Sequence, residues 1–309
     1  MSPNVNDFDV QFASPRGFRQ AFVHKRSQSL GSDRVAPVLV CVHGWPETKR
    51  IFWKVITPFA NAGFDVIVPD LRGFGDSDIA PDGMYDVVSH AQDLYALIHD
   101  HLGHSRVVLL GGDLGGPVIQ EIALRYPDWV DRMIIFNSPL PYNKEKMAGM
   151  NTRASRESAD YYFRQGQDAD ALAAELSSVQ HRRSYIATFY TSRFWAHPGT
   201  FTSDDVDFHT EPFADEIKLR ASFGNYESVF DPLKRIDTPK MGPNDTTKTL
   251  ILFGPSDHVM YPDFDRMASV VFARHVGPFL IRDCGHFVPW EAPHQLVSGT
   301  TAFCSDLLN

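Results

Sequence analysis

Cysteine is scarce in this sequence, which limits how the chain can be held together. The 309 residues contain only Cys41, Cys284 and Cys304. A small and odd number of cysteines excludes a framework of disulfide bonds. Cys41 and Cys284 lie in or beside apolar stretches typical of strands, so we expect buried free thiols at these positions.

A long apolar segment is also missing. No apolar run approaches the roughly 20 residues that a membrane-spanning helix needs. The N-terminal stretch up to Phe12 is polar and contains Pro3 with several Asn and Asp residues. It lacks the basic and apolar parts of a signal peptide. We therefore expect a cytoplasmic protein with no membrane partner.

Basic residues are outnumbered, with 29 Lys and Arg against 38 Asp and Glu, so the formal net charge is -9. This balance gives no electrostatic reason to expect nucleic acid or an anionic membrane as a partner. Internal repeats and low-complexity segments are missing too. A hydrophobic content of 43% and a charged content of 22% are ordinary for a globular protein with a sizeable core.

A recognisable metal-binding pattern is not found. His99, His101 and His104 lie close together, but no carboxylate or cysteine joins them in a known ligand spacing. A helix end followed by an exposed loop explains these histidines. We expect no metal and no other cofactor.

What the sequence does contain is an alternation of short apolar runs and helical patterns. Continuous apolar runs are typical of strands buried in a parallel sheet, and they cover residues 38–42, 66–68, 107–110, 133–136, 250–253 and 279–281. Helical patterns cover residues 51–61, 85–102, 118–126, 263–275 and 289–308. The alternation predicts an open α/β sheet with right-handed crossovers. Residues 10–23 can add two antiparallel edge strands that turn at residues 14–17.

The alternation stops between about residues 140 and 233. This stretch has helical patterns at residues 155–165, 169–179, 184–195 and 212–226, with a further helix start at Ser203. Proline-bearing segments bracket it, and β-branched runs vanish within it. We interpret residues 140–233 as a helical cap inserted after the sixth strand, with a core formed by residues 1–139 and 234–309. The alternative is a second half of the same sheet with weak strand signals.

Asp113 stands at the position most informative for function. It lies between the apolar run 107–110 and a helical pattern, in the run Gly111-Gly112-Asp113-Leu114-Gly115-Gly116. Small residues two before and two and three after it fit the sharp strand–turn–helix bend of a nucleophile elbow. A plain loop is the alternative, since Gly and Asp are common in turns. A carboxylate that attacks an sp³ carbon forms an ordinary ester, so Asp113 indicates an epoxide or an alkyl halide as substrate.

Other polar candidates also follow predicted strands. The segment His43–Pro46 follows the first central strand, Asp257 follows the run 250–253, and His286 follows the run 279–281. In open α/β sheets such residues gather at the carboxyl ends of the strands. Nucleophile, acid and histidine occur in the chain order of a hydrolase triad.

With these motifs the sequence resembles the α/β-hydrolase superfamily and, more narrowly, its epoxide hydrolases. The resemblance runs from Pro37 to the C-terminal helix. It rests on H-G-W-P at residues 43–46, G-x-D-x-G-G at 111–116 and D-C-G-H-F at 283–287. Haloalkane and haloacetate dehalogenases share the aspartate nucleophile.

The resemblance implies a mechanism in two steps. Asp113 opens an epoxide and forms a hydroxyalkyl ester, and His286, oriented by Asp257, activates the water that hydrolyses it. The backbone N–H groups of Trp45 and Leu114 are expected to form the oxyanion hole. The Trp45–Pro46 bond is expected to be cis.

The resemblance also implies two cap tyrosines that protonate the epoxide oxygen. Tyr226, at the end of Phe223-Gly224-Asn225-Tyr226, matches one of them. The usual place of the other falls at Ala159 or Asp160, so Tyr161 or Tyr162 can substitute, or a single tyrosine can do the work. Packing within the cap is the alternative for both tyrosines.

A hydrophobic or aryl epoxide is the expected substrate, with water as the second reactant. We expect the aromatic side chains of Trp45, Tyr162, Tyr190 and Trp195 to bind it. The resemblance also implies a role in detoxification. It does not decide whether the protein forms a homodimer.

Two other functions remain as alternatives. A dehalogenase usually carries Trp or Arg directly after the nucleophile, where this chain has Leu114. Trp45 and Trp195 can nevertheless line a halide pocket. A catalytically silent binding protein is the second alternative, because fold does not determine function. The complete set of Asp113, Asp257 and His286 argues against it.

Overall fold

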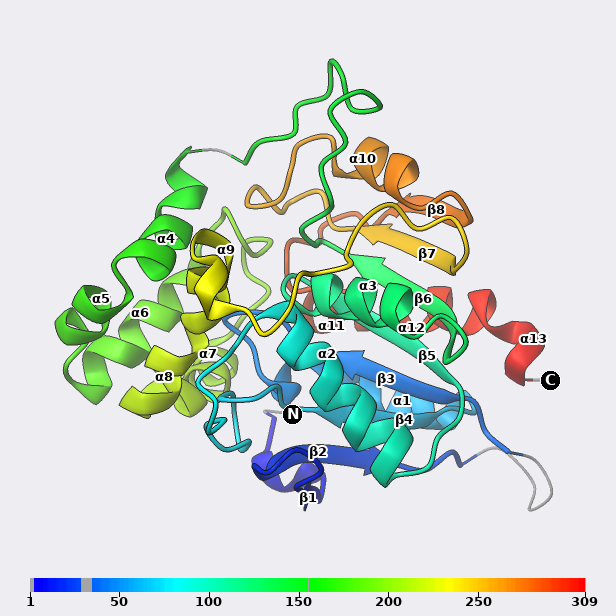
Figure 1. The fold of residues 1–309 in the computed structure, drawn as a ribbon, viewed down its shortest axis with the longest axis horizontal. Helices are drawn as coiled ribbons and strands as arrows, with labels where there is room; N and C mark the ends of the chain where they lie inside the picture. Colours follow the sequence, from blue (N-terminus) through cyan, green and yellow to red (C-terminus); the bar gives the residue numbers. More distant parts are fainter. Residues whose placement is uncertain (1–2, 29–34, 155, 309) are drawn as a thin grey trace.

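The computed structural model describes residues 3–28, 35–154 and 156–308, which form an eight-stranded sheet flanked by helices (Figure 1). The strand order is β1-β2-β4-β3-β5-β6-β7-β8. Strands from β4 to β8 run parallel, and β1 and β2 are antiparallel at one edge. The strands are β1 Val10–Ala13, β2 Gln20–Lys25, β3 Val38–Val42, β4 Asp65–Pro69, β5 Val107–Gly112, β6 Val130–Phe136, β7 Lys248–Phe253 and β8 His275–Leu280.

The apolar runs become the central strands because both faces of the sheet are covered. Every residue of β3, β4 and β5 is buried, as parallel strands between two helical layers require. The edge hairpin is also confirmed, with Val10 opposite Val23 across β1 and β2. The predicted α/β architecture is therefore confirmed.

Helices pack on both faces of the sheet. In Figure 1, α2 (Val87–Tyr95) and α3 (Gly115–Arg125) pack together in front of the strands. Behind them, α1 (Trp53–Asn61), preceded by the short helix η2 (Lys49–Phe52), packs with α11 (Val288–Glu291) and α12 (Pro293–Phe303). α10 (Phe264–Val271) packs on β7 and β8, and α13 (Ser305–Leu308) follows α12.

Three predicted helices of the core have different limits. The pattern at 85–102 forms α2 followed by a π-helix, η3 (Ala96–His101). The pattern at 263–275 ends at Val271, because β8 already begins at His275. The pattern at 289–308 is split, since Pro293 lacks a backbone N–H and therefore begins a new helix.

A group of helices stands beside the sheet, at the left of Figure 1, and connects β6 to β7. None of the described residues between 140 and 233 forms a strand, which excludes the second half-sheet. Ser155, the predicted start of the first helix, lies outside the described residues. The helices are α4 Arg156–Gln167, α5 Ala169–Glu175, α6 Val179–Thr191, α7 Ser203–Thr210, η4 Glu211–Ala214, α8 Glu216–Ser222, α9 Gly224–Phe230 and η5 Pro232–Lys234.

Capping residues explain why these helices differ from their predicted ranges. Ser178 accepts a hydrogen bond from the backbone N–H of His181, so α6 starts directly after it, before the predicted residue 184. Asp215 caps α8 in the same way through Ile217 and Lys218. The single helix predicted at 212–226 is therefore wrong, and this stretch contains η4, α8 and α9.

One apolar core runs through the sheet and into the helices beside it. Buried side chains of α6 and α8, such as Phe189 and Leu219, belong to the same cluster as those of β3 and β5. Cys41, Cys284 and Cys304 are buried free thiols within it, as expected for the first two. Among the described helices, none combines the length and the apolar character needed to span a bilayer.

Candidate active site

The polar segments that follow the strands meet at one edge of the sheet. His43 directly follows β3, Asp113 follows β5, and Asp257 comes shortly after β7. His286 lies between β8 and α11. Because these strands run parallel, their carboxyl ends bring the side chains together.

Asp113 occupies a sharp bend between β5 and α3. Its φ angle is +42°, in the left-handed region that few residues other than glycine adopt. A Cβ at Gly115 would lie 2.1 Å from the carbonyl oxygen of Val42, and one at Gly116 would lie 1.8 Å from Ser138 Oγ. The bend therefore requires glycine at both positions, because β3 and β6 approach so closely.

The two carboxylate oxygens of Asp113 have different neighbours. Oδ1 accepts a hydrogen bond of 2.6 Å from the backbone N–H of Trp45. Oδ2 lies 3.3 Å from Nε2 of His286. The Trp45–Pro46 bond is cis, as expected. Leu114 follows Asp113 directly and places a buried apolar side chain at the start of α3.

His286 is held between two carboxylates. Its Nδ1 lies 2.8 Å from Oδ2 of Asp257, and its Nε2 faces Asp113. Burial alone lowers the pKa of His286, but the charges of Asp257 and Asp113 outweigh burial and hold the pKa well above its usual value of 6.5. The two carboxylates therefore favour the protonated form of the imidazole.

Asn137 is a site residue that the sequence did not reveal. It follows β6, and its side-chain N–H₂ group donates to Asp257 Oδ2 at 2.9 Å and to the carbonyl of Gly254 at 3.0 Å. Its backbone carbonyl accepts from the N–H of Asp113 at 2.9 Å. Val259 and Met260 donate to the other oxygen of Asp257. Asn137 thus links Asp113 and Asp257, and its strand-end position was the available signal.

Aromatic rings pack together around Trp45, whose backbone N–H donates to Asp113. Tyr161 stacks on Trp45 with a ring distance of 5.5 Å and an interplanar angle of 5°. Tyr226 meets the Trp45 ring edge-on at 5.6 Å and lies 5.8 Å from the ring of Tyr161. Trp195 packs 5.1 Å from Tyr161 and 4.6 Å from the ring of His286. Phe189 completes the group with contacts to Trp45 and Tyr161.

The hydroxyls of Tyr161 and Tyr226 share a hydrogen bond. The pKa of each lies well above 10, mainly because of burial, and the charge of Asp113 raises it further. Both phenols are therefore protonated at neutral pH and can donate hydrogen bonds into the site.

The other predicted aromatic contacts lie elsewhere. Tyr162 packs against the rings of Tyr226, Phe230 and Phe163. Tyr190 contacts the loop at residues 43–47, because its hydroxyl donates to the carbonyl of Pro46 at 2.5 Å. Its ring stacks on Phe287. Of the four predicted substrate-binding residues, Trp45 and Trp195 are thus the two whose rings contact Tyr161.

Residues 37–293 match the family model described as alpha/beta hydrolase fold. The chain belongs to this family. Similar curated proteins include the soluble epoxide hydrolase of Corynebacterium sp. (strain C12), 27% identical over 87% of this chain and 90% of its own length. The epoxide hydrolase of Caballeronia sordidicola is 26% identical over 89% of this chain and 88% of its own length.

Solved structures show the same fold as this alpha/beta hydrolase. The epoxide hydrolase CorEH without ligand superposes with a TM-score of 0.80 at 24% identity and covers 97% of this chain and 100% of its own. The juvenile hormone epoxide hydrolase of Bombyx mori superposes with a TM-score of 0.79 at 17% identity, covering 98% of this chain and 77% of its own.

Glu47 is a second buried group of this alpha/beta hydrolase that the sequence did not reveal. Its Oε2 accepts from the N–H of Gly44 at 2.5 Å. Burial, helped by the charge of Asp113, raises the pKa of Glu47 to about 8. Glu47 therefore adds no second full negative charge beside Asp113 at neutral pH.

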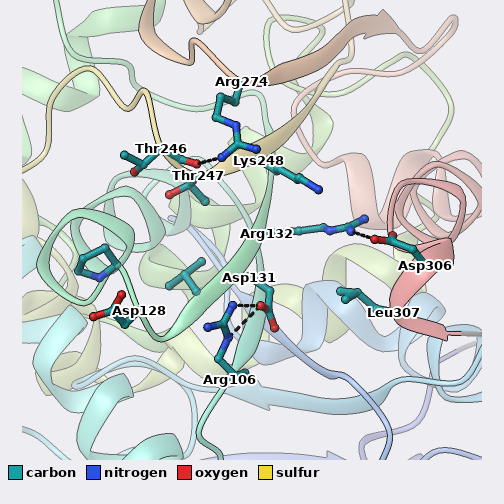
Figure 2. Close-up of a pocket in the computed structure, with 12 residues that line it drawn as sticks. Arg106, Asp128, Asp131, Arg132, Thr246, Thr247, Lys248, Arg274, Asp306 and Leu307 are labelled. Atoms are coloured by element: carbon teal, nitrogen blue, oxygen red, sulfur yellow. Dashed lines mark hydrogen bonds and ion pairs between the residues drawn. The ribbon is translucent and has the colours of Figure 1, made fainter.

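A surface cleft of about 560 Å³ lies at the other end of the strands (Figure 2). It is lined by residues at the starts of β6 and β7, such as Val130 and Lys248. Figure 2 shows Arg132 paired with Asp306 there. The cleft is thus separated from Asp113 by the length of the sheet. Among the described residues, no group of three or more His, Cys, Asp or Glu could hold a metal ion.

Proposed function

We propose that this alpha/beta hydrolase is an epoxide hydrolase that converts an epoxide to a vicinal diol through an ester on Asp113. The observation that carries the proposal is the placement of the Asp113 carboxylate at the bend, 3.3 Å from Nε2 of His286 and near enough to Tyr161 and Tyr226 for its charge to raise the pKa of both phenols. The relatives named epoxide hydrolases support the same activity.

In the first step, Oδ2 of Asp113 attacks an epoxide carbon, because Oδ1 is occupied by the Trp45 N–H. The carbon–oxygen bond of the ring breaks, and the released oxygen takes a proton from the hydroxyl of Tyr161 or Tyr226. General acids of this kind contribute about 10²–10⁴ in rate. The product is a hydroxyalkyl ester of Asp113 with Oδ1 as its carbonyl oxygen.

In the second step, water attacks the ester carbon of Asp113 and gives its proton to Nε2 of His286. Negative charge then develops on Oδ1, where the Trp45 N–H stabilises it, and we assign the N–H of Leu114 as the second donor. Collapse of this intermediate breaks the ester bond, and the leaving alkoxide takes the proton back from His286 to become the second hydroxyl of the diol. The acid proton of the regenerated Asp113 carboxyl returns to the tyrosinate formed in the first step, which restores the carboxylate and the phenol. Asp257 keeps the imidazole oriented throughout.

Ester formation itself prepares His286 to act as a base. In the resting site, Asp257 and Asp113 together hold the pKa of His286 well above its usual value. Esterification removes the charge of Asp113, so the pKa of His286 falls and the imidazole can lose its proton. The nucleophile therefore controls the protonation of the base for the following step.

The cap division belongs to the same proposal. Residues 1–139 and 234–309 form the core that carries Asp113, Asp257 and His286, and residues 140–233 form a cap. Tyr161 on α4 and Tyr226 on α9 come from this cap. The core thus supplies nucleophile and base, and the cap supplies the acid.

A dehalogenase is less well supported by the site. A halide pocket would need free N–H donors, but the indole Nε1 of Trp45 donates to Ser222 Oγ at 3.1 Å. Leu114 offers neither a donor nor a charge to a leaving halide. Two phenolic donors suit an epoxide oxygen, which must gain a proton as the ring opens.

A single turnover in ¹⁸O-water, with enzyme in excess over an aryl epoxide, tests the covalent route. We expect ¹⁸O in the peptide that contains Asp113, because water attacks the carbonyl of the ester, and the first diol should carry unlabelled oxygen. Mass spectrometry of that peptide is the measurement, with Asp113→Ala as the control that forms no ester. Label in the diol alone would overturn the mechanism, and label with a haloalkane instead of the epoxide would favour the dehalogenase.

A further inference from the structure

Glu291, at the end of α11, gathers three backbone N–H groups on one carboxylate. Oε2 accepts from Gly285 at 2.9 Å and from His197 at 2.7 Å, and Oε1 accepts from Phe287 at 2.9 Å. Gly285 and Phe287 are the two residues that flank His286. Hydrogen bonds to an ionised acceptor are about twice as strong as neutral ones, so the loop on both sides of the histidine is tied to one side chain.

The third donor, His197, belongs to a segment that follows α6. This segment, residues 194–197, also contacts His286 directly, since the carbonyl of Trp195 accepts from the N–H of His286 at 2.7 Å. A Cβ at Gly285 would lie 2.3 Å from the same carbonyl, so the histidine loop and the segment are in close contact. Glu291 therefore joins two parts of the chain that are nearly 90 residues apart in sequence.

The same segment also binds the loop of the catalytic acid. The carbonyl of Phe194 accepts from the N–H of His258 at 2.8 Å, and Nδ1 of His197 lies 3.1 Å from Ser256 Oγ. Ser256 and His258 flank Asp257. Segment 194–197 thus contacts both residues that flank Asp257 and accepts a hydrogen bond from the backbone N–H of His286.

We propose that Glu291 is a positioning residue, which sets the orientation of His286 toward Asp113 by fixing its loop to segment 194–197. The inference rests on the proposed function, because it assigns Glu291 to one of the two steps. His286 takes part in ester hydrolysis and not in ring opening. A displaced imidazole therefore slows hydrolysis, whereas the attack by Asp113 continues.

Glu291→Gln separates this role from general stability. Three N–H donors share the two oxygens of Glu291, so the glutamine places its own N–H₂ group against at least one donor. The loop must then shift. A misplacement of about 1 Å in a catalytic group can cost on the order of 10² in rate, and we expect a reduction of this order in hydrolysis.

The experiment follows the ester on Asp113 during a single turnover with an aryl epoxide, using rapid quench and intact-protein mass spectrometry. Glu121→Gln is the matched control. Glu121 is a fully buried glutamate on α3 whose Oε2 accepts from the N–H groups of Lys240 and Met241. We expect Glu291→Gln to accumulate ester, with a formation rate close to that of the wild type. Glu121→Gln should lower stability and leave the ratio of the two rates unchanged.

The outcomes separate the two proposals. If the wild type forms no ester, the proposed function fails. If ester forms and Glu291→Gln hydrolyses it as fast as the wild type, or slows both steps equally, the positioning role is wrong. Should Glu291→Gln fail to fold, Ser256→Ala decides, because it removes only the contact to His197 Nδ1. A smaller shift of the rate ratio in the same direction supports the role, and an unchanged ratio overturns it.

Discussion

At the scale of single residues, our proposal for the acid that opens the epoxide depends on which of two adjacent tyrosines contacts Trp45. Tyr161 stacks on Trp45, whereas Tyr162 packs against Tyr226 and Phe230. We expect Tyr161→Phe to slow ester formation about 10²-fold, since it removes one proton donor. Pre-steady-state ester formation is the measurement, and Tyr162→Phe is the control. Equal effects of the two substitutions would contradict the assignment.

The raised pKa of Glu47 predicts that the free energy of unfolding depends on pH. Its carboxyl has a pKa of about 8 in the folded chain, against 4.5 as the ordinary value. Between these values the folded state retains a proton that the unfolded state has lost, so the contribution of Glu47 to the free energy of unfolding falls as pH rises from about 4.5 to 8. Below that range the contribution is fully present.

Glu47→Gln removes this dependence, because the amide does not ionise. We expect the free energy of unfolding of the variant, relative to the wild type, to increase between pH 5 and pH 8.5. Urea unfolding at both pH values measures it. Two curves that stay parallel over this range would show that Glu47 ionises normally in the folded chain.

The order and strand-end positions of Asp113, Asp257 and His286 could be predicted from sequence, because apolar strands and the residues after them are visible in it. The roles of Asn137 and Glu291 could not be predicted from the sequence. Both work through hydrogen bonds to distant backbone groups, and a polar residue in a loop gives no sign of burial. The choice between Tyr161 and Tyr162 also needed the direction in which α4 turns its side chains.

At the scale of elements, the bend between β5 and α3 depends on close backbone packing. A Cβ at Gly115 would meet the Val42 carbonyl, so we expect Gly115→Ala to lower the free energy of unfolding by about 3 kcal/mol. In Gly242→Ala the new Cβ has a nearest neighbour at 3.6 Å, an ordinary contact, and the change should stay within about 0.5 kcal/mol. Chemical denaturation measures both variants, and a similar loss in both would contradict the packing argument.

The central strands were predictable because a buried parallel strand is a continuous apolar run, as β3 and β5 are. The residues at which helices begin and end were less predictable. Ser178 and Asp215 each start a helix through side-chain hydrogen bonds, and many other Ser and Asp residues in the chain do not. Local pattern indicated helical structure between residues 140 and 233, and tertiary contacts determined how it is divided.

At the scale of the whole molecule, the shared apolar core links the helices of the proposed cap to the sheet. Phe189 and Leu219 of the cap lie in the same cluster as the central strands. Arg50 adds a hydrogen bond to the carbonyl of Phe208 at 2.8 Å. We expect one cooperative thermal transition, with equal calorimetric and van't Hoff enthalpies, in scanning calorimetry. Two separate transitions would show that the cap unfolds by itself.

The hydrogen bonds of segment 194–197 to His286 and His258 use backbone atoms, which has a practical consequence for engineering. The Trp195 side chain takes no part in them, although its ring borders Tyr161 and His286. Residue 195 can therefore be randomised in a mutant library to reshape the space around the substrate and select for one enantiomer. Every amino acid at position 195 supplies the backbone carbonyl that accepts from the N–H of His286.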